Sequence, residues 1–152
     1  MNKNLIVYFC GNNKNIKDIA LEVHKMIDST LFEVETIYDY PEDNHRCQKQ
    51  AKDELNKHLR PKIIDYVHRF EDYGTIILIY PNWCSTLPMA LFTFLEIHPF
   101  TTQRLIPLCI GKRNHGREDI KKLYPRLKIE EGLEIEDINE IKIIKDYLIN
   151  LI

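Results

Sequence analysis

Apolar residues follow two patterns along this chain. The first is a short run of consecutive apolar positions. Such a run fills Leu5–Cys10 and makes up most of Gly74–Tyr80 and of Arg104–Ile110, and it is typical of strands buried on both faces. Phe32–Ile37 alternates apolar and polar residues, which indicates a strand nearer the edge of a sheet. Leu127–Ile135 contains a short last strand, so the pattern predicts five strands.

The second pattern spaces apolar residues three or four positions apart, as on one face of an α-helix. The clearest apolar stripe lies in Asn15–Asp28. The segment Pro41–Leu59 is polar and helix-prone, and Arg60-Pro61 is expected to end its helix. We predict helices over Asn15–Asp28, Pro41–Leu59, Ile63–Phe70, Met89–Ile97 and Glu118–Tyr124, and a last helix with Ile138, Ile141, Ile144, Leu148 and Leu151 on one face.

Strands and helices that alternate predict a parallel sheet covered by helices on both sides, an α/β sandwich. The 152 residues are enough for one domain, residues 1–152, with a substantial core. The longest apolar runs are too short to cross a bilayer, so we expect no membrane insertion. Met1–Asn4 leads directly into a strand, with no signal segment, and we expect a cytoplasmic protein.

Composition and charge narrow the function classes. A formal net charge of −2 excludes general polycation behaviour, so nucleic acid is not an expected partner. The basic stretch Lys112–Lys128 is followed by an acidic one, which favours a solvated surface. The four cysteines are widely spaced and are interpreted as free thiols. The six histidines are scattered without paired spacing, so no metal site is predicted.

Candidate chemistry lies in three polar loops that follow the buried strands. Ligands of open α/β sheets bind beyond the carboxyl ends of the strands, where the strand order reverses. This rule selects Gly11–Asn15, Pro81–Thr86 and Gly111–Arg117.

The first of these loops, CGNNKN, leads into a helix N-terminus, whose free N–H groups and partial positive charge suit a phosphate. Asn12, Asn13 and Asn15 can cap the helix, donate to phosphate oxygens, or do both. The loop matches neither a G-x-G-x-x-G pattern nor a Walker loop, so neither the usual NAD site nor ATP hydrolysis is predicted.

The second loop contains Trp83, the only tryptophan. Its indole either stacks on a planar ligand ring or folds back into the core, and the loop alone does not decide between them. The third loop, GKRNHGR, offers two glycines for close backbone approach with His115 between them.

Together these stretches resemble a flavodoxin, specifically the short flavodoxin-like family common in anaerobic bacteria. The matching stretches run in the family's order from Leu5 to Ile135: LIVYF, PEDNHRCQKQAKDELNKHLRP, YPNWCSTLPMALFTFLE, LIPLC, EDIKKLYP and EGLEI. The resemblance implies a three-layer sandwich whose five-stranded parallel sheet has the order 2-1-3-4-5, with helices on both faces.

The resemblance also implies a bound FMN, with the cofactor supplying the chemistry and no catalytic side chain required. The implied cofactor-binding residues are Cys10, Gly11, Asn12, Asn13, Lys14 and Asn15 at the phosphate, Pro81, Asn82, Trp83, Cys84 and Ser85 at the ring, and Ile110, Gly111, His115 and Gly116 on its other side. Trp83 is expected beside the isoalloxazine.

The chain departs from the family in these loops. Cys10 occupies the position of the first phosphate-binding hydroxyl, and GNNKN replaces the T/S-G-N-T core. Ser85 stands where the family often has glycine, and a serine is expected to resist positive φ.

The leading hypothesis is an FMN-binding redox protein, either an electron carrier or a small flavin-dependent reductase. Its expected partners are a redox partner protein, NAD(P)H or a quinone-like molecule, and no oligomeric state is predicted. One alternative is a flavodoxin fold that has lost FMN and acts as a binding or regulatory module. Another is a thiol or metal site made by Cys10, Cys84 and Cys109, which all fall at the carboxyl ends of predicted strands.

Overall fold

The computed structural model describes residues 3–152, which form one parallel sheet with helices on both sides. The strand order is β2-β1-β3-β4-β5, and β6 also pairs with β4, further along the same edge as β5. The predicted fold class and strand order are therefore confirmed. The strands are β1 (Lys3–Tyr8), β2 (Thr30–Glu33), β3 (Tyr73–Pro81), β4 (Arg104–Ile110), β5 (Lys128–Ile129) and β6 (Leu133–Ile135).

Five α-helices and two short 3₁₀ helices connect the strands within the described residues. No helix of this part of the chain combines the length and apolar character that a membrane span needs. The helices are α1 (Asn15–Met26), α2 (Asn44–Asn56), α3 (Met89–Ile97), α4 (Gly116–Leu123) and α5 (Ile141–Leu151), with 3₁₀ turns at Phe70–Asp72 and Ile138–Glu140.

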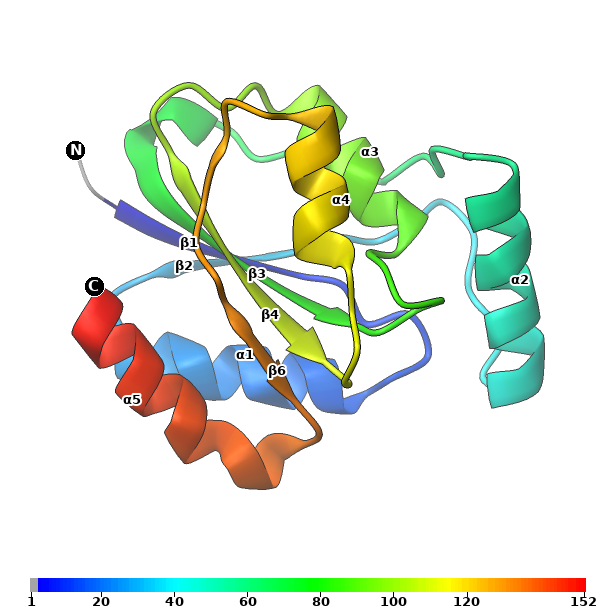
Figure 1. The fold of residues 1–152 in the computed structure, drawn as a ribbon, viewed down its shortest axis with the longest axis horizontal. Helices are drawn as coiled ribbons and strands as arrows, with labels where there is room; N and C mark the ends of the chain where they lie inside the picture. Colours follow the sequence, from blue (N-terminus) through cyan, green and yellow to red (C-terminus); the bar gives the residue numbers. More distant parts are fainter. Residues whose placement is uncertain (1–2) are drawn as a thin grey trace.

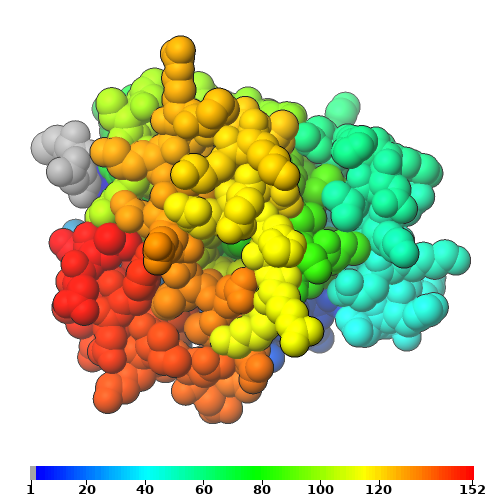
Figure 2. Space-filling model, in the orientation of Figure 1, coloured from blue at the N-terminus to red at the C-terminus, as the bar shows by residue number. Residues whose placement is uncertain are grey.

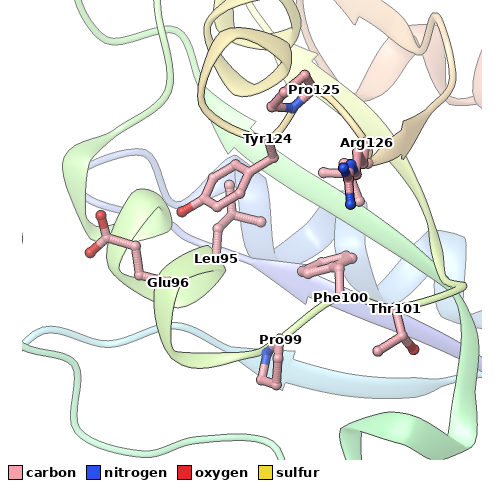
Figure 3. A pocket seen from close by; sticks show the side chains of 9 residues that line it. Leu95, Glu96, Pro99, Phe100, Thr101, Tyr124, Pro125 and Arg126 are labelled. Carbon is pink, nitrogen blue, oxygen red and sulfur yellow. The ribbon is translucent and has the colours of Figure 1, made fainter.

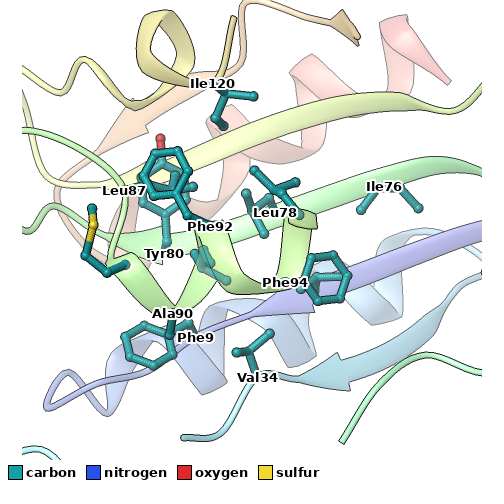
Figure 4. Close-up of a cluster of buried hydrophobic side chains, with 14 of the residues drawn as sticks. Phe9, Val34, Ile76, Leu78, Tyr80, Leu87, Ala90, Phe92, Phe94 and Ile120 are labelled. Atoms are coloured by element: carbon teal, nitrogen blue, oxygen red, sulfur yellow. The ribbon is translucent and has the colours of Figure 1, made fainter. Parts of the chain in front are cut away.

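The central strands are buried on both faces because the sheet is covered on both sides. Successive side chains of a strand point to opposite faces. Leu5 and Val7 accordingly join the core beneath α3 and α4, whereas Ile6 joins the core against α1 and α5. Figure 4 shows the first of these cores, with Phe94 from α3 and Ile120 from α4 facing the strands. This double burial explains the unbroken apolar runs.

Two predicted elements were wrong in extent or kind. The second strand ends at Glu33 instead of Ile37, and the helix predicted over Ile63–Phe70 is absent, with only the 3₁₀ turn beginning at Phe70. The backbone N–H groups of this segment bond to distant acceptors instead of to one another: Ile64 donates to Glu35 O at 2.8 Å and Val67 to His98 Nε2 at 2.8 Å. Tertiary partners thus replaced the expected helix.

The last strand is split into β5 and β6 opposite a proline. Pro107 lies inside β4 and has no N–H to offer a neighbouring strand. The residues that interrupt the edge end at Gly132, whose φ is +73° and whose added Cβ would lie 2.0 Å from Pro107 O. Only a glycine fits this close approach.

Helix α2 does not lie flat on the sheet but stands at the end of the molecule where the strands finish (Figure 1). Asn12 Nδ2 lies 3.5 Å from Asn44 Oδ1, which connects the start of α2 to the first polar loop. The long polar segment of the sequence therefore becomes a wall beside the predicted site.

Candidate functional site

The three predicted loops meet at the carboxyl ends of β1, β3 and β4. We call residues 10–15 loop 1, residues 81–86 loop 2 and residues 110–116 loop 3. Asn82 N donates to Ile110 O at 3.1 Å, and His115 N donates to Ser85 O at 2.6 Å. Loops 2 and 3 are thus in direct contact with each other.

Loop 1 turns tightly into α1. Gly11 has φ +58°, and Asn13 N donates to Cys10 O at 2.9 Å. Asn13 Oδ1 accepts from Asn15 N, the first residue of α1, at 3.0 Å, whereas the N-cap residue Lys14 makes no side-chain capping bond. Lys14 is exposed, and none of the loop's residues carries a carboxylate. The donors and the positive helix end suit an anion.

Trp83 lies in the core, the plainer of the two alternatives that the sequence allowed. Its side chain is only 3% exposed. The indole meets Phe9 edge-on at 5.3 Å and Tyr40 at 4.8 Å between ring centroids. A Cβ added to Gly11 would lie 2.2 Å from Trp83 Cζ2, so the indole packs directly against the backbone of loop 1. The indole therefore supports loops 1 and 2 and presents no face to solvent here.

The Trp83 indole rests on a polar network that includes a buried carboxylate. Glu54 of α2 is 3% exposed and accepts hydrogen bonds from Tyr38 Oη at 2.8 Å and from Tyr40 Oη at 2.9 Å. Burial, followed by the Glu54 carboxylate, raises the pKa of Tyr40. Both phenols stay protonated and hold α2 against the aromatic cluster.

Loop 2 presents Cys84 and Ser85 to the outside. Their φ values are +56° and +63°, and Thr86 N donates to Trp83 O at 3.1 Å. Two central residues with positive φ are the mark of a type I′ turn, in which Asn and Gly are preferred. Ser85 adopts positive φ although a serine resists it, because the surrounding contacts impose this conformation at a cost of about 1 kcal/mol or more per residue.

Asn114, which the sequence analysis did not select, connects the two loops. Its Nδ2 donates to Asn82 Oδ1 at 2.7 Å and to Thr86 O at 2.9 Å. Its Oδ1 accepts from Gly116 N at 2.8 Å and from Tyr80 Oη at 3.2 Å. Both donors and both acceptor sites of the carboxamide are therefore used, and they fix loop 2, loop 3 and the start of α4 together.

Loop 3 is also fixed from β6. The Glu134 carboxylate accepts from Arg113 N at 3.1 Å and from Asn114 N at 2.9 Å. Lys112 Nζ donates to Glu134 O at 2.8 Å, and Arg117 Nε to Glu130 O at 2.8 Å. These three basic or acidic side chains, which the sequence suggested as solvated surface, hold the loop in place.

A hollow of about 540 Å³, which we call the loop hollow, lies beside the contact between loops 2 and 3. Figure 2 shows its surroundings, where the yellow surface of α4 and the cyan surface of α2 flank a green strip from loop 2 and α3. Its volume is within the range of small-molecule sites. It is lined by Leu55, Cys84, Ser85, Thr86, His115, Glu118, Asp119 and Lys122.

The predicted site residues thus divide into groups. Cys84, Ser85 and His115 reach the loop hollow, Lys14 and Asn15 are exposed on loop 1, and the others shape the loop backbones. Sequence reasoning missed Asn114, Glu134 and Leu55. Asn114 stood inside the selected loop 3 and could have been found there, whereas Leu55 comes from a helix with no pattern that points to the site.

A larger cavity, of about 560 Å³, lies elsewhere and contains no predicted site residue. It opens near the amino end of β4, between the end of α3 and the segment after α4 (Figure 3). Phe100 and Tyr124 form its aromatic walls, and Glu96 at its rim is paired with Arg60 Nε at 2.8 Å. The cavity is therefore separate from the three loops.

The alternative of a thiol or metal site is not supported by the described residues. No group of three or more His, Cys, Asp or Glu side chains in residues 3–152 has metal-binding geometry. Cys10 belongs to the core beside α1, whereas Cys109 belongs to the core on the other face of the sheet. Burial raises the pKa of Cys10 to about 11 and that of Cys109 to about 12, so both remain thiols near neutral pH.

Comparison with solved structures gives close matches to the fold. A candidate flavoprotein from Bacteroides eggerthii matches with a TM-score of 0.83 and 21% identity, over 98% of this chain and 99% of that chain. One from Bacteroides uniformis matches with a TM-score of 0.84 and 20% identity, over 97% of each chain. A Lactobacillus acidophilus flavoprotein in complex with FMN gives 0.73 and 18%, over 93% of this chain and 97% of that chain.

These identities are low enough that the structural matches establish the fold alone. Comparison with curated protein sequences gives no match. The sequence pattern of the flavodoxin family, however, matches residues 3–151, which is almost the whole chain. The chain therefore belongs to the flavodoxin family.

Proposed function

We propose that this protein binds FMN non-covalently and acts in electron transfer, as a carrier or as a flavin-dependent reductase. The observation that carries the proposal is the meeting of loops 1, 2 and 3 at the carboxyl ends of β1, β3 and β4 in a member of the flavodoxin family. The FMN complex of the related Lactobacillus acidophilus protein supports the choice of cofactor.

The phosphate end of the site fits the chemistry of FMN. Loop 1 opens α1, carries no carboxylate and exposes Lys14 next to the helix N-terminus. Backbone N–H groups and an ammonium can bind a phosphate without the hydroxyls that Cys10 and its neighbours lack. We propose that Gly11, Asn12 and Lys14 make these contacts.

The ring end fits with one revision. Trp83 is buried beneath the loops, so we propose that the isoalloxazine lies against Cys84, Ser85 and His115, which line the loop hollow. Leu55 would supply the apolar contact from α2. When bound, FMN would supply the redox chemistry, while the protein binds the ring, orients it and excludes water.

The proposal is tested by titrating the purified protein with FMN and with riboflavin, following the visible spectrum and the heat of binding. FMN is expected to bind more tightly than riboflavin, because only FMN has a phosphate. Lys14→Glu should weaken FMN binding about 10-fold and leave riboflavin binding unchanged, whereas Lys145→Glu, at an exposed position of α5, should change neither.

A protein that binds neither flavin would contradict the proposal. The second candidate function, a binding or regulatory module without FMN, would then be favoured, and one observation supports it already. Asn114 joins Asn82 and Thr86 directly, so the contacting parts of loops 2 and 3 leave no gap for a ring between them. A cytoplasmic location remains our expectation for either function.

A further inference from the structure

A second hollow continues from the loop hollow along the space between α2 and α4. Its volume is about 300 Å³, and we call it the helix groove. Four residues line both hollows: Leu55, Thr86, Asp119 and Lys122. A molecule in the helix groove would therefore lie next to whatever occupies the loop hollow.

The interior of the helix groove is apolar. Met89 and Phe92 of α3 are buried at 5% and 4% exposure, and Leu123 stands at the rim with 52% exposure. Leu55 of α2 is half-buried on the opposite side. These side chains offer contacts to a flat, apolar molecule.

Two of the charged groups that line the helix groove, Arg60 and Asp119, have partners within the protein. Arg60 pairs with Glu96 at 2.8 Å, and its guanidinium carbon lies 5.2 Å from the centroid of the Phe92 ring. Asp119 Oδ2 accepts from Thr86 Oγ1 at 2.5 Å. Lys122, which makes no ion pair within residues 3–152, remains available as a donor at the junction of the two hollows. This pattern suits a neutral ligand with hydrogen-bond acceptors, such as carbonyl oxygens.

The volume suits a small molecule, because about 300 Å³ lies at the lower end of the range of small-molecule sites. We infer that the helix groove is an acceptor site for a small, flat, apolar quinone. This inference rests on the proposed flavin function and favours the reductase over the carrier of electrons between proteins.

The reaction balances with a nicotinamide donor. A quinone gains two electrons and two protons to become a hydroquinone. NADH or NADPH gives up a hydride, which carries two electrons and one proton, and solvent supplies the second proton. FMN bound at the loop hollow would supply the relay for both electrons, so the quinone needs only to lie beside that hollow.

The test is a titration of ¹⁵N-labelled protein with 2,3-dimethyl-1,4-naphthoquinone, with and without FMN. Both ring carbons of this quinone are substituted, so it does not alkylate the Cys84 thiol. We expect shifts at the amides of Thr86, Phe92 and Leu123. Leu123→Glu should weaken binding about 10-fold, because it brings a carboxylate to an apolar rim.

The matched control is Leu21→Glu, which changes an exposed leucine of α1 on the opposite side of the sheet. It should leave quinone binding unchanged. Quinone binding that is absent, or that maps to the cavity of Phe100 and Tyr124, or that ignores Leu123→Glu, would overturn the acceptor site. If such a protein still binds FMN, the flavin function stands. If the quinone binds as expected but FMN does not, the groove stands as a binding site and the redox role falls.

Discussion

Asn114 Nδ2 donates to Asn82 Oδ1 over 2.7 Å, and this amide pair joins the carboxyl end of β4 to that of β3. The same Asn114 side chain also satisfies Thr86 O, Gly116 N and Tyr80 Oη. Such a carboxamide cannot be replaced without leaving several half-buried groups unpaired. It is the residue on which the geometry of loops 2 and 3 depends most.

We therefore expect Asn114→Ala to lower the free energy of unfolding by about 2–3 kcal/mol, as measured by urea denaturation. Asn150→Ala is the control, because its side chain makes one exposed hydrogen bond, to Asp146 O. The control should change stability by less than about 0.5 kcal/mol. Equal effects of the two substitutions would contradict the role of Asn114.

A glycine in the turn of loop 2 is expected to stabilise the protein. Ser85 has φ +63°, so Ser85→Gly should raise the free energy of unfolding by about 0.5–1 kcal/mol by relieving this strain. Ser85→Ala removes the same hydroxyl but keeps a Cβ, and it should give no gain. Chemical denaturation of both variants checks the prediction, and a gain for alanine would show that φ is not the cause.

Gly11 should not tolerate a side chain. A Cβ at this position would lie 2.2 Å from Trp83 Cζ2, and φ is +58°. Gly11→Ala should cost about 2 kcal/mol or more of stability and alter the fluorescence of Trp83, because the buried indole must move. Asn12→Ala, one residue along the same loop, is expected to leave the emission spectrum unchanged. An unshifted spectrum for Gly11→Ala would place the indole away from loop 1.

His98 makes stability depend on pH. It is 2% exposed, Nε2 accepts from Val67 N at 2.8 Å, and Nδ1 lies 2.8 Å from Phe94 O, to which it can donate. Burial lowers its pKa, so the unfolded chain binds a proton that the folded protein resists.

The stability that neutral His98 gives is therefore complete above about pH 6.5, the ordinary pKa of histidine, and is lost as the pH falls below that value. We expect Tm to decrease between pH 7 and pH 5. His98→Gln should lower Tm at pH 7 but flatten its pH dependence, since glutamine does not titrate. If the variant keeps the full slope, another group is responsible.

The sequence alone determined the layers of this protein. Leu5–Cys10 and Ile76–Tyr80 are apolar without interruption because both faces of a central strand are covered. The apolar stripe from Ile16 to Val23 predicted α1, because a helix that covers a sheet buries only one of its faces. The positions of loops 1, 2 and 3 followed from the rule that polar segments after buried strands gather at one edge of a parallel sheet.

Only the tertiary structure decided what those loops do with their side chains. Trp83 is buried because Phe9 and Gly11, which follow β1, and Tyr40, which precedes α2, pack around its indole. Asn114 became the central contact because Asn82 and Tyr80 end the neighbouring strand. Local periodicity reports which face of an element is buried, but a contact between distant segments depends on the packed geometry of all of them.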